Sequence, residues 1–118
     1  MHFNIFFMLD FSKIEYIDTH SHLQFEGYSE NRNEVIKRMC ENRIVTICIG
    51  TDLKESELAK KLAEENENIF YSVALHPHDN LNEAEDAFKN EKDYFEKLKA
   101  LACDKKCLAI GECGLDYF

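Results

Sequence analysis

The stretch "IVTICIG", residues 44–50, is an unbroken series of apolar and β-branched residues. Such a run is typical of a β-strand that is covered on both faces, as the inner strands of a parallel sheet are. The segment before it, residues 29–43, has the spacing of an amphipathic helix. Four residues form its expected apolar face: Val35, Ile36, Met39 and Cys40. A helix that leads directly into a buried strand indicates a βα architecture.

The same alternation extends along the rest of the chain. Further strands are expected at residues 14–20, 69–76 and 107–112, and further helices at 54–68, 79–88 and 91–104. The expected buried face of the helix at 54–68 carries Leu58, Leu62 and Ala63. Strand and helix in regular succession predict parallel βα units with right-handed crossovers, and therefore an α/β fold class.

Composition limits the classes of protein to which the chain can belong. Its 118 residues, 45% of them hydrophobic, suit one globular domain with a modest core. The formal net charge of −9 opposes generic binding to phosphate backbones, which depends on Lys and Arg. A phosphate substrate is still compatible with this charge, because a bound metal ion can reverse the sign of a site.

The cysteines and the N-terminal segment predict a cytoplasmic protein that does not interact with membranes. The number of cysteines is odd and no CxxC occurs, so we expect five reduced thiols, most of them acting as small hydrophobes. A zinc site at Cys103 and Cys107 is an alternative, but its spacing lacks the usual zinc pattern. Residues 1–13 contain neither a signal peptide nor a span long enough for a membrane, and we interpret them as an N-terminal extension.

Asp18, His20 and His22 interrupt the apolar character of the first expected strand at intervals of two residues. In a regular strand such residues share one face. Two neutral imidazoles at the end of a strand form a metal-binding pair, and a nearby carboxylate can orient one of the rings. The alternative is a pair of histidines in a loop with no shared ligand.

Polar groups also follow the other three expected strands. His76, His78 and Asp79 follow the third, Glu112 and Asp116 the fourth, and Asp52 the second. Since the carboxyl ends of parallel strands meet at one rim, we expect these groups to converge there.

Convergence at this rim favours a metal centre made by His20, His22 and Glu112. A carboxylate at the end of a buried strand is costly without a cation, which adds weight to Glu112 as a ligand. Histidine and carboxylate ligands suit Zn²⁺, Mn²⁺, Fe²⁺ or Mg²⁺, either as one ion or as two ions that share Glu112. The reaction class that such a centre predicts is metal-assisted hydrolysis. His76 and His78 also fit a rigid turn around Pro77, and Asp116 fits a helix cap.

Three blocks of the sequence resemble signature blocks of the TatD family of metal-dependent deoxyribonucleases. They are "YIDTHSHLQF" (16–25), "ALHPHD" (74–79) and "AIGECGLDYF" (109–118), in the family's order and at compatible spacing. The resemblance implies a TIM-type (β/α)₈ barrel that hydrolyses DNA phosphodiester bonds, commonly as a 3′-to-5′ exonuclease.

The resemblance also implies roles for individual residues. It implies that His20 and His22 bind one divalent metal ion and that Glu112, the expected catalytic residue, bridges two. His76 is then a candidate for contact with the substrate or its phosphate. We expect Asp18, His76 and Asp116 to contact either the substrate or the metal ligands.

The chain departs from the family pattern in its extent. Residues 14–118 correspond to the first half of the barrel, and the two histidines and one aspartate of the second half have no counterpart here. We therefore expect a fragment that is inactive alone. Two alternatives stay open: another barrel hydrolase that acts on esters, lactones or amides, and an inactive metal-binding half-barrel that pairs with itself. Neither the oligomeric state nor the identity of the metal follows from the sequence.

Overall fold

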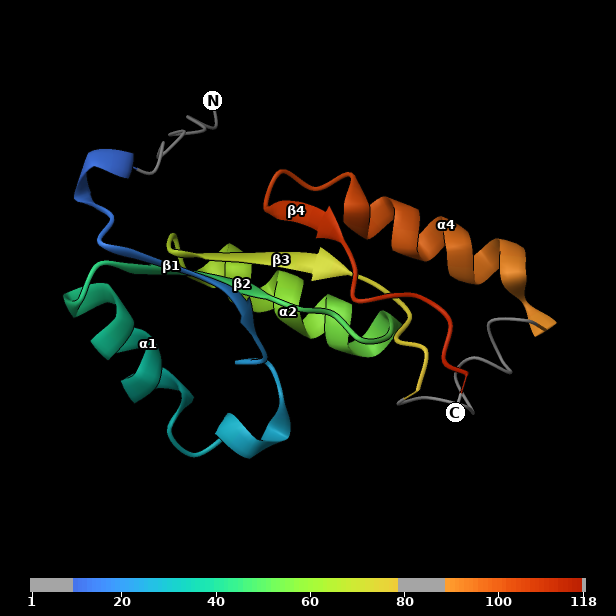
Figure 1. Ribbon diagram of the computed structural model, residues 1–118, viewed down its shortest axis with the longest axis horizontal. Helices are drawn as coiled ribbons and strands as arrows, with labels where there is room; N and C mark the ends of the chain where they lie inside the picture. The colour runs from blue at the N-terminus through green and yellow to red at the C-terminus, as the bar shows by residue number, and fades with distance from the viewer. Residues whose placement is uncertain (1–9, 79–88, 118) are drawn as a thin grey trace, which may run out of the picture.

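A parallel sheet of four strands forms the centre of the protein (Figure 1). The structure is a computed structural model that describes residues 10–78 and 89–117. The strands are paired in chain order: β1 (Tyr16–Ser21), β2 (Ile44–Cys48), β3 (Ile69–Val73) and β4 (Cys107–Ile110). All three pairings are parallel, as the alternating pattern predicts, and this arrangement is that of a partial TIM barrel.

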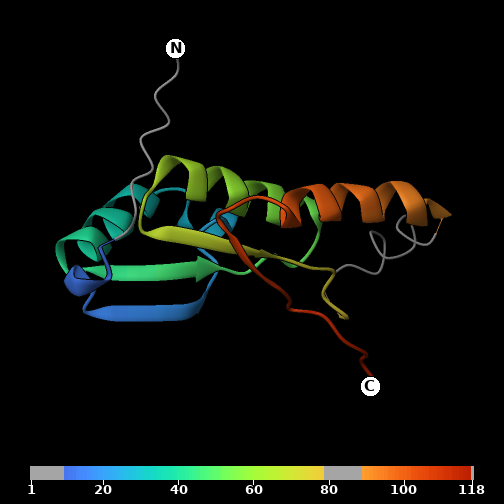
Figure 2. The same ribbon diagram turned by 90° about the horizontal axis from the view of Figure 1, so that it is seen from above.

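In the described part of the chain, three α-helices connect the strands and lie on one face of the sheet, as Figure 2 shows. They are α1 (Arg32–Glu41), α2 (Leu53–Glu65) and α4 (Glu91–Ala102). Two short 3₁₀ turns flank the first strand, η1 (Phe11–Lys13) and η2 (Glu26–Tyr28). The helix expected at 79–88 falls outside the described residues. None of the helices in residues 10–78 and 89–117 has the length and apolarity needed to cross a membrane.

The core lies between β3 and α2. Tyr71 of β3 is fully buried, and its hydroxyl donates a 2.7 Å hydrogen bond to the carbonyl of Leu101 in α4. Ala59, Leu62 and Ala63 of α2 pack against the same cluster. Burying these side chains removes apolar surface from water, which is the main favourable contribution to folding. The core therefore fixes the covering helices to the strand at the middle of the sheet.

Two details of the expected helix faces are wrong. Leu58 is 38% exposed, because the buried stripe of α2 runs through Ser56, Ala59 and Leu62 instead. Successive helical residues are rotated by about 100°, so Leu58 lies beside that stripe. In α1, Ile36 is buried, whereas Cys40 is exposed.

All five cysteines are free thiols, as expected. The expectation that most of them act as core hydrophobes is wrong, since only Cys48 is buried. Burial raises the pKa of the Cys48 thiol, which makes it unreactive. The exposed thiols are Cys40, Cys103 and Cys113.

Gly50, two residues after β2, lies close to both β3 and the first turn of α2. A Cβ atom at Gly50 would lie 2.7 Å from the Ser72 carbonyl oxygen and would also collide with the Ser56 hydroxyl. The Gly50 amide faces Ser72 as well, with its nitrogen 3.2 Å from the carbonyl oxygen. The chain needs glycine here because the backbone of β3 and the first turn of α2 leave no space for a side chain.

Replacing Gly50 with Ala should lower the free energy of unfolding by about 1–3 kcal/mol, because the methyl group overpacks a site bounded by backbone. Urea denaturation monitored by circular dichroism measures the change. Gly27→Ala is the matched control, since a Cβ at Gly27 meets nothing within 4 Å. Equal urea midpoints for the two variants would contradict the close approach.

Candidate metal centre

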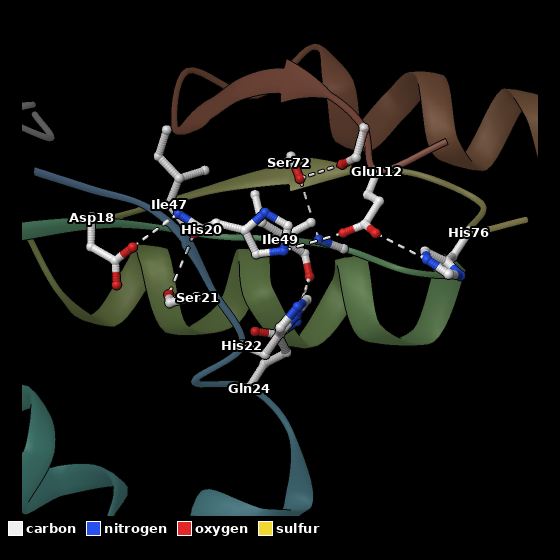
Figure 3. Close-up of polar contacts among 12 residues, drawn as sticks. Asp18, His20, Ser21, His22, Gln24, Ile47, Ile49, Ser72, His76 and Glu112 are labelled. Atoms are coloured by element: carbon white, nitrogen blue, oxygen red, sulfur yellow. Dashed lines mark hydrogen bonds and ion pairs between the residues drawn. The ribbon is translucent and has the colours of Figure 1, made fainter. Parts of the chain in front are cut away.

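Three potential metal ligands meet at the carboxyl end of the sheet (Figure 3). One ligand atom each from His20, His22 and Glu112 lies within 4.8 Å of the other two. Within residues 10–78 and 89–117, no other group of three His, Cys, Asp or Glu side chains is this close together. Cys103 and Cys107, the alternative zinc site, therefore do not belong to any such group there. His20 belongs to β1, His22 follows it directly, and Glu112 follows β4.

The meeting of His20 and Glu112 requires a curved sheet. Strands β1 and β4 are the two outer strands, and in a flat sheet they would be about 14 Å apart, three spacings of about 4.8 Å. Even so, His20 Nε2 lies 3.2 Å from Glu112 Oε2. The two side chains therefore project toward each other across the same face, as inward-facing residues of a barrel do.

His22 is held by the main chain of β2's carboxyl end. Its Nδ1 lies 3.1 Å from the Ile49 carbonyl oxygen. Because a carbonyl only accepts hydrogen bonds, Nδ1 carries the proton and donates it, which leaves the lone pair on Nε2 for a metal ion. The ring also stacks on Phe25, with centroids 4.5 Å apart, and meets the ring of His20 edge-on at 5.1 Å.

Glu112 is held from its other side by His76. His76 Nε2 lies 3.0 Å from Glu112 Oε1, and the backbone N–H of His78 donates to His76 Nδ1 at 3.2 Å. Since Nδ1 accepts, the neutral ring carries its proton on Nε2 and donates it to the carboxylate. The sequence led us to expect that His76 contacts either the substrate or a metal ligand. In the structure His76 contacts Glu112, one of the three potential ligands.

Glu112 is not the buried carboxylate that the sequence indicates. Its side chain is 40% exposed, because β4 is an outer strand and is itself largely exposed. The argument that burial alone requires a cation at Glu112 is therefore wrong. What favours a cation is the position of the carboxylate between two imidazoles.

Asp18 lies apart from the three ligands. The register between β1 and β2 changes between Asp18 and Ser21, so the regular alternation expected for Asp18, His20 and His22 does not hold. The Asp18 carboxylate accepts a 3.0 Å hydrogen bond from the backbone N–H of His20. Its contact is therefore with the main chain of a ligand residue, and Figure 3 shows it on the far side of His20 from Glu112.

The other strand-end residues have different partners. Asp116 Oδ2 lies 2.9 Å from Nδ1 of His78, at the exposed end of the same region. Asp52 caps the first turn of α2, where its carboxylate accepts the backbone N–H of Glu55 at 2.6 Å. Asp79 lies outside the described residues. The contact between His22 and the Ile49 carbonyl has no sequence signal, because every residue carries a carbonyl.

The residues present fit a divalent metal ion. Two neutral imidazoles and one carboxylate are the donor set of many sites for zinc and other first-row metals. The hydrogen bond at His22 Nδ1 and the one at Glu112 Oε1 also match the supporting contacts that ligating side chains usually make. Because His22 Nδ1 contacts the Ile49 carbonyl and Glu112 Oε1 contacts His76, His22 Nε2 and Glu112 Oε2 are the atoms that these two side chains can offer to a metal ion.

Comparison with known proteins places this arrangement in a family. Residues 17–118 match the family described as TatD related DNase. An uncharacterized metal-dependent hydrolase of Buchnera aphidicola is 32% identical over 106 residues, which cover 86% of this chain and 40% of that protein. The uncharacterized metal-dependent hydrolase YabD of Bacillus subtilis is 33% identical over 101 residues, covering 85% and 37%.

A third relative is named for an activity. The 3′-5′ ssDNA/RNA exonuclease TatD of Pantoea ananatis is 37% identical over 92 residues, which cover 76% of this chain and 33% of that protein. The chain therefore spans a third to two-fifths of the length of these three relatives.

We expect the chain to bind Mn²⁺ or Zn²⁺ through these three residues. A metal ion that binds only the folded state, at a free concentration 100 times its Kd, adds about 2.7 kcal/mol to the free energy of unfolding. His22→Ala and Glu112→Gln should abolish this gain, because each removes one of three ligands. Thermal denaturation with and without metal measures it.

His78→Gln is the control for this experiment, since the His78 side chain contacts Asp116 and lies outside the ligand group. It should keep the full stabilisation. Equal stabilisation of the wild type, His22→Ala and Glu112→Gln would show that the metal binds elsewhere.

Proposed function

The chain belongs to the TatD related DNase family, and from that membership we propose that it forms the metal-binding part of a hydrolase that cleaves DNA phosphodiester bonds. The single observation that carries the proposal is the convergence of His20, His22 and Glu112 at the rim of the sheet. The relative from Pantoea ananatis, a named 3′-5′ exonuclease, supports attack from the 3′ end of the strand. Residues 14–118 are the proposed hydrolase segment, and residues 1–13 are an extension to it.

Each residue of the site has a proposed role. His20 and His22 hold one metal ion, and Glu112 serves as a ligand and, where two ions are bound, as the bridge between them. When bound, a divalent ion supplies an activated water molecule and stabilises negative charge on the attacked phosphoryl oxygen. His76 keeps the Glu112 carboxylate in place by donating from Nε2, and we assign it a second role in contact with the substrate phosphate.

Asp18 and Asp116 have supporting roles in this proposal. Asp18 fixes the backbone of His20 at the strand end, where the carboxylate accepts the His20 N–H. Asp116 orients the imidazole of His78 at the entrance to the same rim. Five free thiols support the further proposal that the protein works in the reducing environment of the cytoplasm.

A second candidate function keeps the same centre but a different substrate. Two of the relatives are described only as metal-dependent hydrolases, without a nucleic acid in their names. The chemistry that a divalent ion would supply at this site applies to carbonyl groups as well as to phosphoryl groups, so an ester, lactone or amide is the alternative substrate. The third possibility, a metal-binding half-barrel without catalysis, predicts metal binding and no hydrolysis in any context.

A chimera separates these functions. Residues 17–118, the span of the family match, replace the corresponding segment of the Pantoea ananatis exonuclease, and the product is assayed on single-stranded DNA labelled at the 3′ or the 5′ end. We expect metal-dependent loss of the 3′ label first. Glu112→Gln in the chimera should lower the rate by at least about 100-fold, because it removes a metal ligand.

The control chimera carries Lys37→Gln, at a 75% exposed side chain of α1 outside the ligand group, and should stay active. A folded chimera that binds metal and hydrolyses p-nitrophenyl esters but not DNA would favour the second function. A folded chimera that binds metal and hydrolyses neither substrate would favour the third.

The 118-residue chain by itself should hydrolyse DNA slowly or not at all. The family resemblance implies two further histidines and an aspartate, and this chain holds no residues that correspond to them. Incubation with labelled single-stranded DNA and 1–10 equivalents of Mn²⁺, beside the active chimera, gives the comparison. Rates equal to those of the chimera would contradict the need for additional ligands.

A further inference from the structure

The Ile49 carbonyl accepts hydrogen bonds from two side chains of the β1–η2 loop. His22 Nδ1 lies 3.1 Å from this oxygen, and Gln24 Nε2 donates to it at 2.8 Å. Figure 3 shows His22 and Gln24 next to each other beside Ile49. We infer that Gln24 is a positioning residue for the metal ligand His22, acting through the shared Ile49 carbonyl. This inference rests on the metal centre proposed above.

The burial of Gln24 is not explained by stability. The residue is only 3% exposed, yet its Oε1 has no hydrogen-bond partner among the described residues. A buried amide oxygen without a partner opposes folding. An apolar side chain of similar length would avoid this cost. The feature that distinguishes Gln24 from such a side chain is the Nε2 group, which donates a hydrogen bond to the Ile49 carbonyl.

Hydrogen bonds fix the main chain that carries Gln24. The Arg32 guanidinium donates to the carbonyls of Leu23, Gln24 and Phe25 at 2.6, 3.0 and 2.9 Å, and these three bonds fix the backbone of the β1–η2 loop. On the sheet side, the Ile49 N–H donates to the Ser21 carbonyl at 2.8 Å. The N–H and the carbonyl of Ile49 are thus both hydrogen-bonded to the segment that carries His20 and His22.

Two acceptor sites on one oxygen explain how Gln24 acts on His22. A carbonyl oxygen offers two lone pairs in one plane, and the amide of Gln24 occupies one of them. The other is left in a fixed direction for the proton of His22 Nδ1. The tautomer of His22, and with it the lone pair on Nε2, then depends on the orientation of the Ile49 carbonyl.

Gln24→Met tests the inference, because it removes the donor together with the unpartnered oxygen and keeps the length of the side chain. We expect the Kd for Mn²⁺, measured by titration with electron paramagnetic resonance, to rise about 10-fold, the lower end of the range for residues that support ligands. The thermal midpoint without metal should stay equal or rise. A merely structural residue would lower the midpoint and leave the Kd unchanged.

Asn68→Leu is the matched control. Asn68 Nδ2 donates at 2.9 Å to the carbonyl of Ile44, at the opposite end of the same strand β2. The variant removes the same kind of amide-to-carbonyl bond far from the ligands. It should therefore lower the thermal midpoint and leave the Kd for Mn²⁺ unchanged.

A second measurement does not depend on metal. Nitrogen chemical shifts of the imidazoles report the tautomer of His22 in the metal-free protein. In the wild type His22 should carry its proton on Nδ1, and in Gln24→Met the two tautomers should be mixed. An unchanged tautomer together with an unchanged Kd would overturn the inference. A wild type that binds no Mn²⁺ but shows the tautomer shift would instead overturn the metal centre and leave the positioning intact.

Discussion

Parallel pairing of β1 to β4 in chain order is the constraint on which the rest of the structure depends. Each connection must bring the chain back to the end of the sheet at which the strands begin. Because such crossovers are right-handed and the strands follow one another in order, α1, α2 and α4 pack on the same face. The carboxyl ends of all four strands then meet at one rim. Residues that are far apart in the chain, such as His20 and Glu112, come into contact there because the sheet is also curved.

Backbone groups set the site as much as side chains do. The Ile49 carbonyl determines which nitrogen of His22 carries the proton, and the His78 N–H does the same for His76. Ile49 directly follows β2 and His78 lies five residues beyond the end of β3, where the sheet no longer uses every backbone donor and acceptor. The strand ends of a parallel sheet therefore supply ligands and the hydrogen bonds that orient them from the same short segments.

The sequence predicts the order of strands and helices, because apolar runs and helical spacing record burial directly. It also predicts that His20, His22 and Glu112 converge, since each follows an apolar run and parallel strands end together. The position of Asp18 could not be predicted, because a change of strand register has no marker in the residue pattern. The exposure of Glu112 depends on β4 being an outer strand, and the roles of Ile49 and Gln24 depend on geometry alone.

In the proposed function, charge would give the metal centre a second task beyond activating water. The chain has a formal net charge of −9, so a phosphodiester approaching its surface meets repulsion. At the rim, two neutral imidazoles and one carboxylate carry a local charge of about −1, and a single divalent ion changes it to about +1. His20 is exposed and the other two ligands are partly exposed, while the covering helices lie on one face of the sheet. Metal binding would thus both attract the substrate and select where on an acidic protein it binds.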